Sequence, residues 1–266
     1  MILSKNNEKI KKVRSLKQKK YRDESGVFLV EGERAVKDAL AFSRVLAVFG
    51  TEDALRKCGL AETGEVPESN ADEKTAVYAV SPEVYETLSD TVSPQGITAV
   101  AQKRQGISAE KSENAGNAEN AGKAERSLLL DGVSDPGNVG AILRTAAAAG
   151  YQNVFLADCA DPYSPKAVRA AMGGIFRVNL AEGNREEILS LIRVPIVVAS
   201  MEGENAFNAN LPAAFCLAVG NEANGVSDFV RKKAAFTVSI PMQSGVESLN
   251  AAVSAGILMY LFAEKP

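Results

Sequence analysis

Residues 131–150 read DGVSDPGNVGAILRTAAAAG, and this stretch decides how the second half of the chain folds. A short apolar strand ending at Leu130 runs into the turn pairs Asp-Gly, Asp-Pro and Gly-Asn. An alanine-rich helix follows, with Asn138 where a helix N-cap belongs and Gly150 where a helix ends. A strand, a turn-rich loop and a helix in that order are typical of an α/β domain. A single cation, Arg144, stands among the alanines of the helix.

The rest of the second half repeats this alternation of strands and helices. Apolar runs such as PIVVAS (195–200) and CLAVG (216–220) are continuous rather than alternating, which favours a parallel sheet covered on both faces. Ligands bind beyond the carboxyl ends of such strands, in the loops. The predicted strands are Ser127–Asp131, Asn153–Ala157, Phe176–Leu180, Pro195–Ser200, Phe215–Val219 and Phe236–Ile240, with helices at Asp228–Lys233 and Ser248–Ala263.

Residues 106–126, GISAEKSENAGNAENAGKAER, contain almost nothing that could fill a core, so we expect a linker there. It divides the chain into a first domain, 1–105, and a second domain, 127–266. Alternating helices and strands predict a small α/β sandwich for the first domain, with recognition rather than catalysis as its role. Its predicted elements are helix Glu8–Lys20, strand Val27–Glu31, helix Glu33–Phe42, strand Val45–Phe49, helix Glu52–Cys58, strand Ala76–Val80, helix Pro82–Leu88 and strand Ile97–Gln102.

The composition excludes several classes of enzyme. The chain has no histidine, which rules out HExxH zinc chemistry and Ser-His-Asp or Cys-His hydrolysis. The three cysteines, Cys58, Cys159 and Cys216, form no CxxC pattern, so we expect neither a disulfide framework nor a bound metal. The sequence contains no apolar run of about 18 residues and no secretion signal. We therefore expect a cytoplasmic protein without a membrane span.

The net charge of −3 argues against a generic nucleic-acid binder, but the cations are unevenly distributed. Nine lysines and arginines lie between Lys5 and Arg22, against one acid, Glu8. Such a run is often only the solvated face of a helix. A ratio of nine to one in eighteen positions favours contact with a polyanion.

Two further loops combine glycine with polar side chains. The loop AVGNEANGVS (218–227) matches neither GxGxxG nor a phosphate-binding loop, and Glu222 in it could simply stabilise the next helix. In SIPMQSGVESLNAAVSAGILMYLF (239–262), Ser248 can cap the long helix and Asn250 falls in its first turn. Small residues along that helix permit close approach of another backbone.

In this order and with these spacings, the three loops resemble the three motifs of the SpoU/TrmH family, RNA ribose 2′-O-methyltransferases of the knotted SPOUT class. The resemblance covers the whole second domain. One departure is Ala223, which stands where the family often has glycine. The stretch FLVEGERAVKDAL (28–40) resembles the L30e-like substrate-binding domain that is often attached to these enzymes. The implied fold class is therefore α/β, with a trefoil-knotted C-terminal methyltransferase domain on a parallel sheet and a small N-terminal domain.

The resemblance implies that S-adenosylmethionine lies bent in the knot. An adenine needs an apolar slot and main-chain hydrogen bonds rather than charges. The positions implied to hold the cofactor are Gly220, Ile240, Leu249, Leu217 and Met242. The positions implied to surround the reacting ribose are Arg144, Asn138, Glu222, Ser248 and Asn250.

Arg144 has the central role in the implied mechanism. A guanidinium rarely loses its proton, so we expect Arg144 to grip a neighbouring phosphate and stabilise the developing alkoxide rather than act as a base. The alanines around it suit a close subunit contact, and the resemblance implies a homodimer through the methyltransferase domain. The implied partner is RNA, ribosomal in preference to transfer RNA. The expected RNA-binding cations are Lys11, Lys12, Arg14, Lys19, Lys20 and Arg22.

Two other classes of function stay open. One is a non-catalytic RNA-binding protein that retains a methyltransferase fold, which cofactor-binding calorimetry would recognise. The other is a nucleotide-dependent α/β enzyme, which the missing phosphate-loop patterns disfavour.

Overall fold

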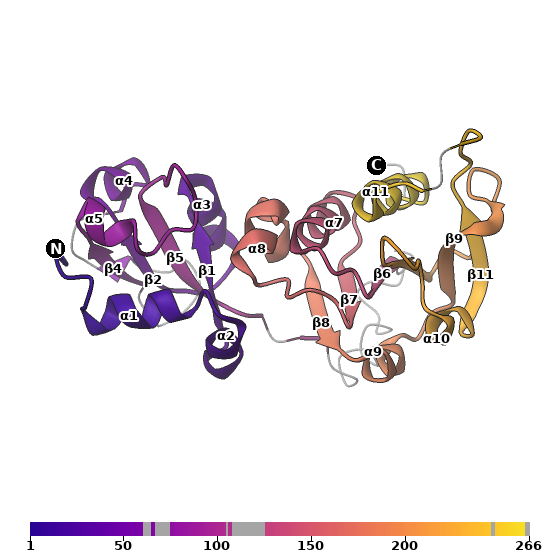
Figure 1. Cartoon of the computed structure of the whole chain (residues 1–266), viewed down its shortest axis with the longest axis horizontal. Coiled ribbons are helices and arrows are strands. Elements are labelled where there is room, and N and C mark those ends of the chain that lie inside the picture. Colours follow the sequence, from indigo (N-terminus) through magenta and orange to yellow (C-terminus); the bar gives the residue numbers. More distant parts are fainter. Residues whose placement is uncertain (61–64, 67–74, 105, 108–125, 246–247, 264–266) are drawn as a thin grey trace. The chain divides into compact units, whose positions relative to one another are not determined.

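The chain folds into two compact units, shown in Figure 1. The first comprises residues 1–104 and 161–176, and the second comprises 105–160 and 177–266. The computed structural model describes residues 1–60, 65–66, 75–104, 106–107, 126–245 and 248–263. The predicted linker, 106–126, therefore lies outside the described residues except at its two ends.

The first unit is built on a five-stranded mixed sheet in the order β1-β5-β2-β4-β3. Its core combines strand residues such as Leu29 and Val100 with Ile10, Val13 and Leu16 from the N-terminal segment. The strands are β1 (Val27–Glu31), β2 (Val45–Gly50), β3 (Glu65–Val66), β4 (Thr75–Ala79) and β5 (Ile97–Gln102). The helices are α1 (Glu8–Ser15), α2 (Lys19–Ser25), α3 (Glu33–Phe42), α4 (Glu52–Lys57) and α5 (Pro82–Tyr85).

The predicted single helix Glu8–Lys20 is two helices, because the chain breaks at the extended Gln18. The buried Arg22 guanidinium donates to the carbonyl oxygens of Leu16 (2.7 Å) and Lys17 (2.8 Å). These carbonyls stand just past the end of α1, where helix carbonyls lose their partners along the helix. Arg22 therefore closes the end of α1, an interaction that helical periodicity does not reveal.

The segment 161–176 lies within the second half of the sequence but belongs to the first unit. It contains α8 (Pro165–Ala171), which packs against β1, and a 3-10 turn over Gly174–Phe176. Phe28 of β1 contacts the rings of Tyr163 and Phe176, with centroids 4.9 and 6.2 Å apart. This segment was predicted to lie in the second domain, with Phe176 beginning a strand. That strand, β8 (Asn179–Gly183), instead begins at Asn179, after the chain has left the first unit.

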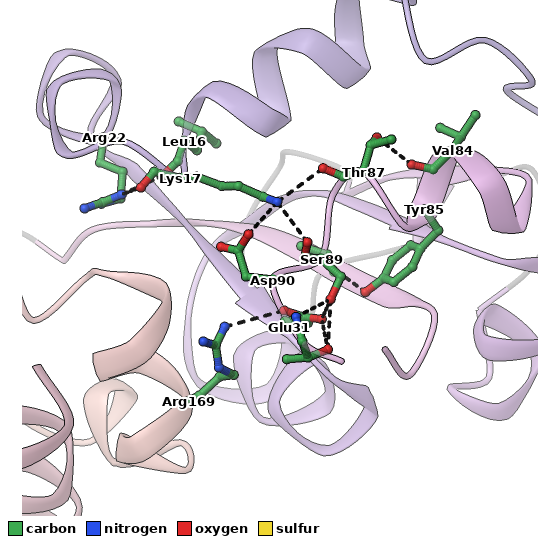
Figure 2. Close-up of polar contacts among 12 residues, drawn as sticks. Leu16, Lys17, Arg22, Glu31, Val84, Tyr85, Thr87, Ser89, Asp90 and Arg169 are labelled. Atoms are coloured by element: carbon green, nitrogen blue, oxygen red, sulfur yellow. Dashed lines mark hydrogen bonds and ion pairs between the residues drawn. The ribbon is translucent and has the colours of Figure 1, made fainter. Parts of the chain in front are cut away.

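Polar contacts also hold the segment against α2 and the end of β1. Asp161 pairs with Arg22, and both side chains are almost fully buried. The carboxylate of Glu31, at the end of β1, accepts a hydrogen bond from the Ser89 hydroxyl. Its other oxygen lies 3.7 Å from Arg169 Nη1 of α8. Both contacts are drawn in Figure 2. The chain thus passes from the second unit into the first and back between β7 and β8.

The second unit is a six-stranded sheet in the order β11-β9-β10-β6-β7-β8, and every pairing in it is parallel. The predicted parallel sheet is confirmed, while the trefoil knot stays a prediction. Leu128, Leu129, Leu130 and Val197 are fully buried, which explains the continuous apolar runs. The other strands are β6 (Arg126–Asp131), β7 (Asn153–Ala157), β9 (Ile196–Asn205), β10 (Phe215–Gly220) and β11 (Ala234–Ser239). The helices are α7 (Pro136–Ala148), α9 (Arg185–Leu191), α10 (Asp228–Arg231) and α11 (Ala251–Leu261).

Two predicted helix caps are wrong by a few residues. Asp135, not Asn138, caps α7, accepting from the Asn138 amide at 2.9 Å, because Pro136 suits the first helical position. Asn250, not Ser248, caps α11, accepting from the amides of Ala252 and Val253. Gly150 ends α7 as predicted, with a φ of +82°. Helices α7 and α11 pack side by side (Figure 1).

Candidate active site

A cavity of about 420 Å³ opens at the carboxyl ends of β9, β10 and β11, within the second unit. This volume falls in the range of small-molecule sites, and its position is where parallel sheets bind ligands. Its walls are Ala199–Glu202 of β9, Val219–Gly225, Arg231, Val238, Ile240, Met242, Ser248, Leu249, and Ala251, Ser254 and Leu258 of α11.

The 220–227 loop forms one wall of the cavity and is folded very tightly. Asn221 and Gly225 exchange backbone hydrogen bonds of 3.0 and 2.8 Å, and the Asn221 side chain accepts from the amide of Ala223. A β-carbon on Gly220 would lie 2.0 Å from the carbonyl carbon of Gly225, so only glycine fits there. Gly225 itself has a φ of +64°. Both glycines are therefore demanded by the turn that shapes the cavity wall.

Asn138, Glu222 and Asn250 form a hydrogen-bonded chain that joins all three sequence motifs. Asn138 Nδ2 donates to Glu222 Oε1 at 2.6 Å, and Asn250 Nδ2 donates to Asn138 Oδ1 at 3.1 Å. A carboxylate only accepts, so Asn138 must turn its amide nitrogen to Glu222. Asn250 uses its own oxygen to cap α11, which leaves its nitrogen for Asn138. Both ends thus fix the orientation of the central amide.

Arg144 is not brought to these three residues within one chain. It is exposed on α7 and makes no hydrogen bond or ion pair with any residue that the structure describes. Six helical residues separate it from Asn138, which moves it about 9 Å along the axis and onto another face. Ser248 lines the cavity, as does Glu222.

Four of the five positions expected to hold the cofactor line the cavity: Gly220, Ile240, Met242 and Leu249. The prediction for Leu217 is not supported. Leu217 is fully buried in β10, pairs with Leu128 and Val197, and is not among the lining residues. It precedes the carboxyl end of its strand by three residues, whereas ligands are contacted beyond strand ends.

A charged cluster that the sequence motifs did not single out lies behind the 220–227 loop. Asp131 is buried at the end of β6 and accepts from Arg185 Nε and the Ser227 amide, both at 2.7 Å. Arg185 also pairs with Asp158, the residue after β7. The sequence did contain a signal for this cluster. Asp131 and Asp158 each stand at the end of an apolar strand, and Arg185 stands at the start of a helix.

Cys159 also lies at this edge of the sheet, but its environment opposes nucleophilic chemistry. Its thiol donates to the carbonyl oxygens of Leu130 and Ala157, at 3.2 and 3.4 Å. Burial raises the pKa of the Cys159 thiol to about 12. The thiol is therefore neutral at physiological pH.

Among the described residues, no group of three acidic, cysteine or histidine side chains could hold a metal ion. In the same part of the chain, no helix combines the length and apolar character of a membrane span.

The basic segment is less uniformly available than its composition suggests. Lys11, Lys12 and Arg14 are exposed, as are Lys19 and Lys20. Lys11 pairs with Glu8, and Lys19 and Lys20 pair with Asp23 and Glu24 on their own helix. The prediction for Arg22 is wrong, because its side chain is buried against Asp161. A guanidinium that is buried and paired with a carboxylate is not accessible to RNA.

The residues around the cavity suit S-adenosylmethionine. The apolar side chains of Val219, Ile240 and Leu249 are of the kind that an adenine needs around it, and Gly220 lets the loop backbone fold close against the end of β10. Glu202 and Glu222 are the carboxylates among the lining residues, and they suit a ligand that carries positive charge.

Comparisons with known proteins agree with this geometry. The SpoU rRNA Methylase family matches residues 125–260, and the MRM3-like substrate binding domain matches residues 7–99. The chain is 31% identical to the 23S rRNA (guanosine(2553)-2′-O)-methyltransferase RlmP of Bacillus subtilis, with 97% of each chain covered. It is 32% identical to the 23S rRNA (guanosine-2′-O-)-methyltransferase RlmB of Neisseria meningitidis, over 75% of this chain and 80% of that relative.

Solved structures show the same likeness over both units. A putative RNA methyltransferase of the TrmH family from Porphyromonas gingivalis is 31% identical, with a TM-score of 0.79 over 97% of this chain and 98% of the other. An AdoMet-bound rRNA methyltransferase from Sinorhizobium meliloti is 28% identical, with a TM-score of 0.82 over 98% and 96% of the two chains.

Proposed function

This chain belongs to the SpoU rRNA methylase family, and from that premise we propose that it transfers a methyl group from S-adenosylmethionine to a ribose 2′-hydroxyl of ribosomal RNA. The observation that carries the proposal is the chain of hydrogen bonds from Glu222 through Asn138 to Asn250. It brings three separate motifs together, and Glu222 belongs to the wall of the cavity.

The chain's own residues supply binding and alignment. Bound S-adenosylmethionine supplies an electrophilic methyl group and a neutral leaving group. The 220–227 loop with Ile240, Met242 and Leu249 holds the cofactor. Glu222 and Ser248, which line the cavity, border the reacting ribose together with Asn138 and Asn250, which are hydrogen-bonded in a chain to Glu222. The Arg144 guanidinium offers only hydrogen-bond donors, so it grips a phosphate and stabilises the developing alkoxide, and the phosphate or solvent receives the hydroxyl proton. Much of the rate then comes from alignment.

Ribosomal RNA is the favoured substrate for two reasons. The relatives RlmP and RlmB are both named as 23S rRNA methyltransferases, and residues 7–99 match a substrate-binding domain. We assign RNA recognition to the first unit and catalysis to the second, and we place the reaction in the cytoplasm. The direct test is mass-spectrometric mapping of ribose methylation in RNA from cells with and without the gene. One site lost without the gene and restored by purified protein supports the proposal.

A non-catalytic RNA-binding protein is the alternative. It would bind RNA without taking up the cofactor, so calorimetry with S-adenosylmethionine separates the two functions. Absence of cofactor binding in the folded protein contradicts the methyltransferase.

A second copy of the chain completes the site in our proposal. One face of α11 packs on α7, while Val253, Ile257 and Tyr260 remain exposed at i, i+4 and i+7. An apolar stripe at this spacing is one helix face and is typical of a subunit contact. Arg144 on the neighbouring α7 is exposed and unpaired among the described residues. A twofold contact here lets each copy lend Arg144 to the other's Glu222–Asn138–Asn250 chain.

Mixed dimers test this sharing. Arg144→Ala and Asn138→Ala should each abolish methylation as homodimers, with S-adenosylmethionine affinity kept within a few fold, since both residues act on the RNA side. Random exchange makes half of the dimers mixed, and each mixed dimer has one site built from two intact halves. About a quarter of wild-type activity should therefore return.

The control gives the two variants different affinity tags, so that co-purification of both tags after mixing shows that subunits have exchanged. If Arg144 acted within its own copy, the two inactive variants would stay inactive after exchange. Near-normal turnover by Arg144→Ala alone would contradict the assigned role.

A further inference from the structure

We propose that Asp131 and Arg185 are positioning residues that hold the 220–227 loop in the shape that binds the cofactor. This inference rests on the proposed function, because it concerns the same cavity. Neither residue lines the cavity, so each acts through the loop.

Asp131 anchors the far end of the loop. It is the last residue of β6 and lies opposite Gly220, the last residue of β10, in the parallel pairing. Its side chain has no exposed surface. Carboxylate Oδ2 accepts from the Ser227 amide and Oδ1 from Arg185 Nε, each at 2.7 Å. One buried carboxylate therefore ties the end of the loop to the edge of the sheet.

The near end of the loop is tied to the same strand end. Asn221 Nδ2 donates to the carbonyl oxygen of Gly132 at 2.9 Å. Gly132 has a φ of +72°, and a β-carbon there would lie 3.2 Å from Arg185 Nη2. The strand end 131–132 thus holds both ends of the loop, with Arg185 packed closely behind it.

Arg185 makes the burial of the Asp131 carboxylate tolerable. An unpaired buried carboxylate is strongly disfavoured, and a guanidinium compensates it with several donors of fixed geometry. Arg185 Nε donates a hydrogen bond to Asp131 and a second one, of 3.2 Å, to Ser227 Oγ. Arg185 Nη1 donates to the carboxylate of Asp158. Arg185 therefore contacts the loop at Ser227 both directly and through Asp131.

The contacts of Asp131 and Arg185 with the loop contribute more to cofactor binding than to packing of the apolar core. Residues 222–225 are exposed and contribute little to the buried apolar cluster, but they form a wall of the cavity. Backbone that must meet a ligand binds best when it is held in place beforehand. Removing the contacts of Asp131 or Arg185 should therefore lower the affinity for the cofactor more than the free energy of unfolding.

The test uses Asp131→Asn and Arg185→Gln, with Asp158→Asn as the matched control. Asp158 meets the same guanidinium but has no hydrogen bond to the loop among the described residues, and asparagine tolerates its φ of 52°. Calorimetry with S-adenosylhomocysteine should show the dissociation constant rising about tenfold or more for the first two variants, the worth of a hydrogen bond to a charged group. Asp158→Asn should stay within about twofold of wild type.

Two further readouts separate positioning from general destabilisation. In the cofactor-free protein, the Ser227 amide should exchange with deuterium faster in Arg185→Gln than in Asp158→Asn. The KM for S-adenosylmethionine should rise while the KM for RNA stays unchanged. A purely structural role would lower the midpoint of thermal unfolding without these effects.

The outcomes distinguish failure of the proposed function from failure of the positioning role. Wild-type protein that fails to bind the cofactor overturns the proposed function itself. If wild type binds and Arg185→Gln binds equally well with a protected Ser227 amide, the positioning role is wrong. An equal loss in Asp158→Asn also overturns it. If Asp131→Asn does not fold, Arg185→Gln still decides, because the Arg185 side chain is 33% exposed.

Discussion

Replacing Gly220 by alanine is the sharpest test of how the cavity wall is built. The new β-carbon would lie 2.0 Å from the carbonyl carbon of Gly225 and 2.2 Å from its oxygen and from the Val226 nitrogen. All three are backbone atoms, so no side-chain rotation can relieve the overlap. Ordinary contacts begin at 3.4 Å, and the strand end and the loop must therefore separate by about 1.4 Å.

Such a separation breaks the paired backbone hydrogen bonds between Asn221 and Gly225. Two hydrogen bonds at about 1 kcal/mol each, with about 1–3 kcal/mol for overpacking, predict a loss of roughly 3–5 kcal/mol in the free energy of unfolding. The cofactor loses its binding surface at the same time. We expect its affinity to fall by at least about tenfold, since a shift of more than an ångström disrupts every main-chain contact there.

Gly150→Ala is the matched control in the same unit. Gly150 also has a positive φ, +82°, but a β-carbon there meets nothing within 4 Å and it lies outside the cavity wall. The free energy of unfolding of Gly150→Ala should fall by only roughly 1–2 kcal/mol, which is the cost of placing alanine in a left-handed conformation. Urea unfolding and cofactor calorimetry on both variants measure the difference. If Gly220→Ala is as stable and binds the cofactor as tightly as Gly150→Ala, the reasoning is refuted.

The basic segment gives two further predictions. Replacing Lys12 and Arg14 with glutamine should flatten the dependence of log RNA affinity on log salt by up to about two units, because each lost phosphate contact releases about one counterion fewer. The same charge change at Lys19 and Lys20, which already face acids, should flatten it less; equal slopes in filter-binding titrations would count against this assignment. Arg22→Gln should leave the salt dependence unchanged but lower the free energy of unfolding by about 3 kcal/mol, the usual cost of breaking a buried ion pair. Loss of RNA affinity in a fully stable Arg22→Gln protein would restore its predicted role.

Local patterns were enough for much of the fold. Strand Val27–Glu31 and helix Glu33–Phe42 match the structure at both ends, because burial period and turn residues are properties of neighbouring positions. The parallel sheet followed from uninterrupted apolar runs. The three motif loops placed Asn138, Glu222 and Asn250 at one edge of the sheet, where Asn138 hydrogen-bonds to both of the others.

Composition by itself was misleading where burial decides the role of a charge. Arg22 looks like every other cation of the basic segment, but its partner is Asp161, 139 positions away. No local pattern carries that pairing, and the same holds for Asp131 with Arg185, 54 positions apart. Helix caps were missed by a few residues for a smaller reason: several residues near each start can cap, and the surrounding loop selects one.

Local sequence patterns therefore gave most of the elements and the class of sheet, because these depend on side-chain chemistry and short-range spacing. The residues for methyl transfer came from the resemblance to the SpoU/TrmH family. Tertiary structure decided which of those residues meet. It assigned segment 161–176 to the first unit, left Arg144 exposed on α7, and buried Asp131 behind the 220–227 loop. The physical reason is that burial and pairing of a charge depend on groups that only the folded chain brings within a few ångströms.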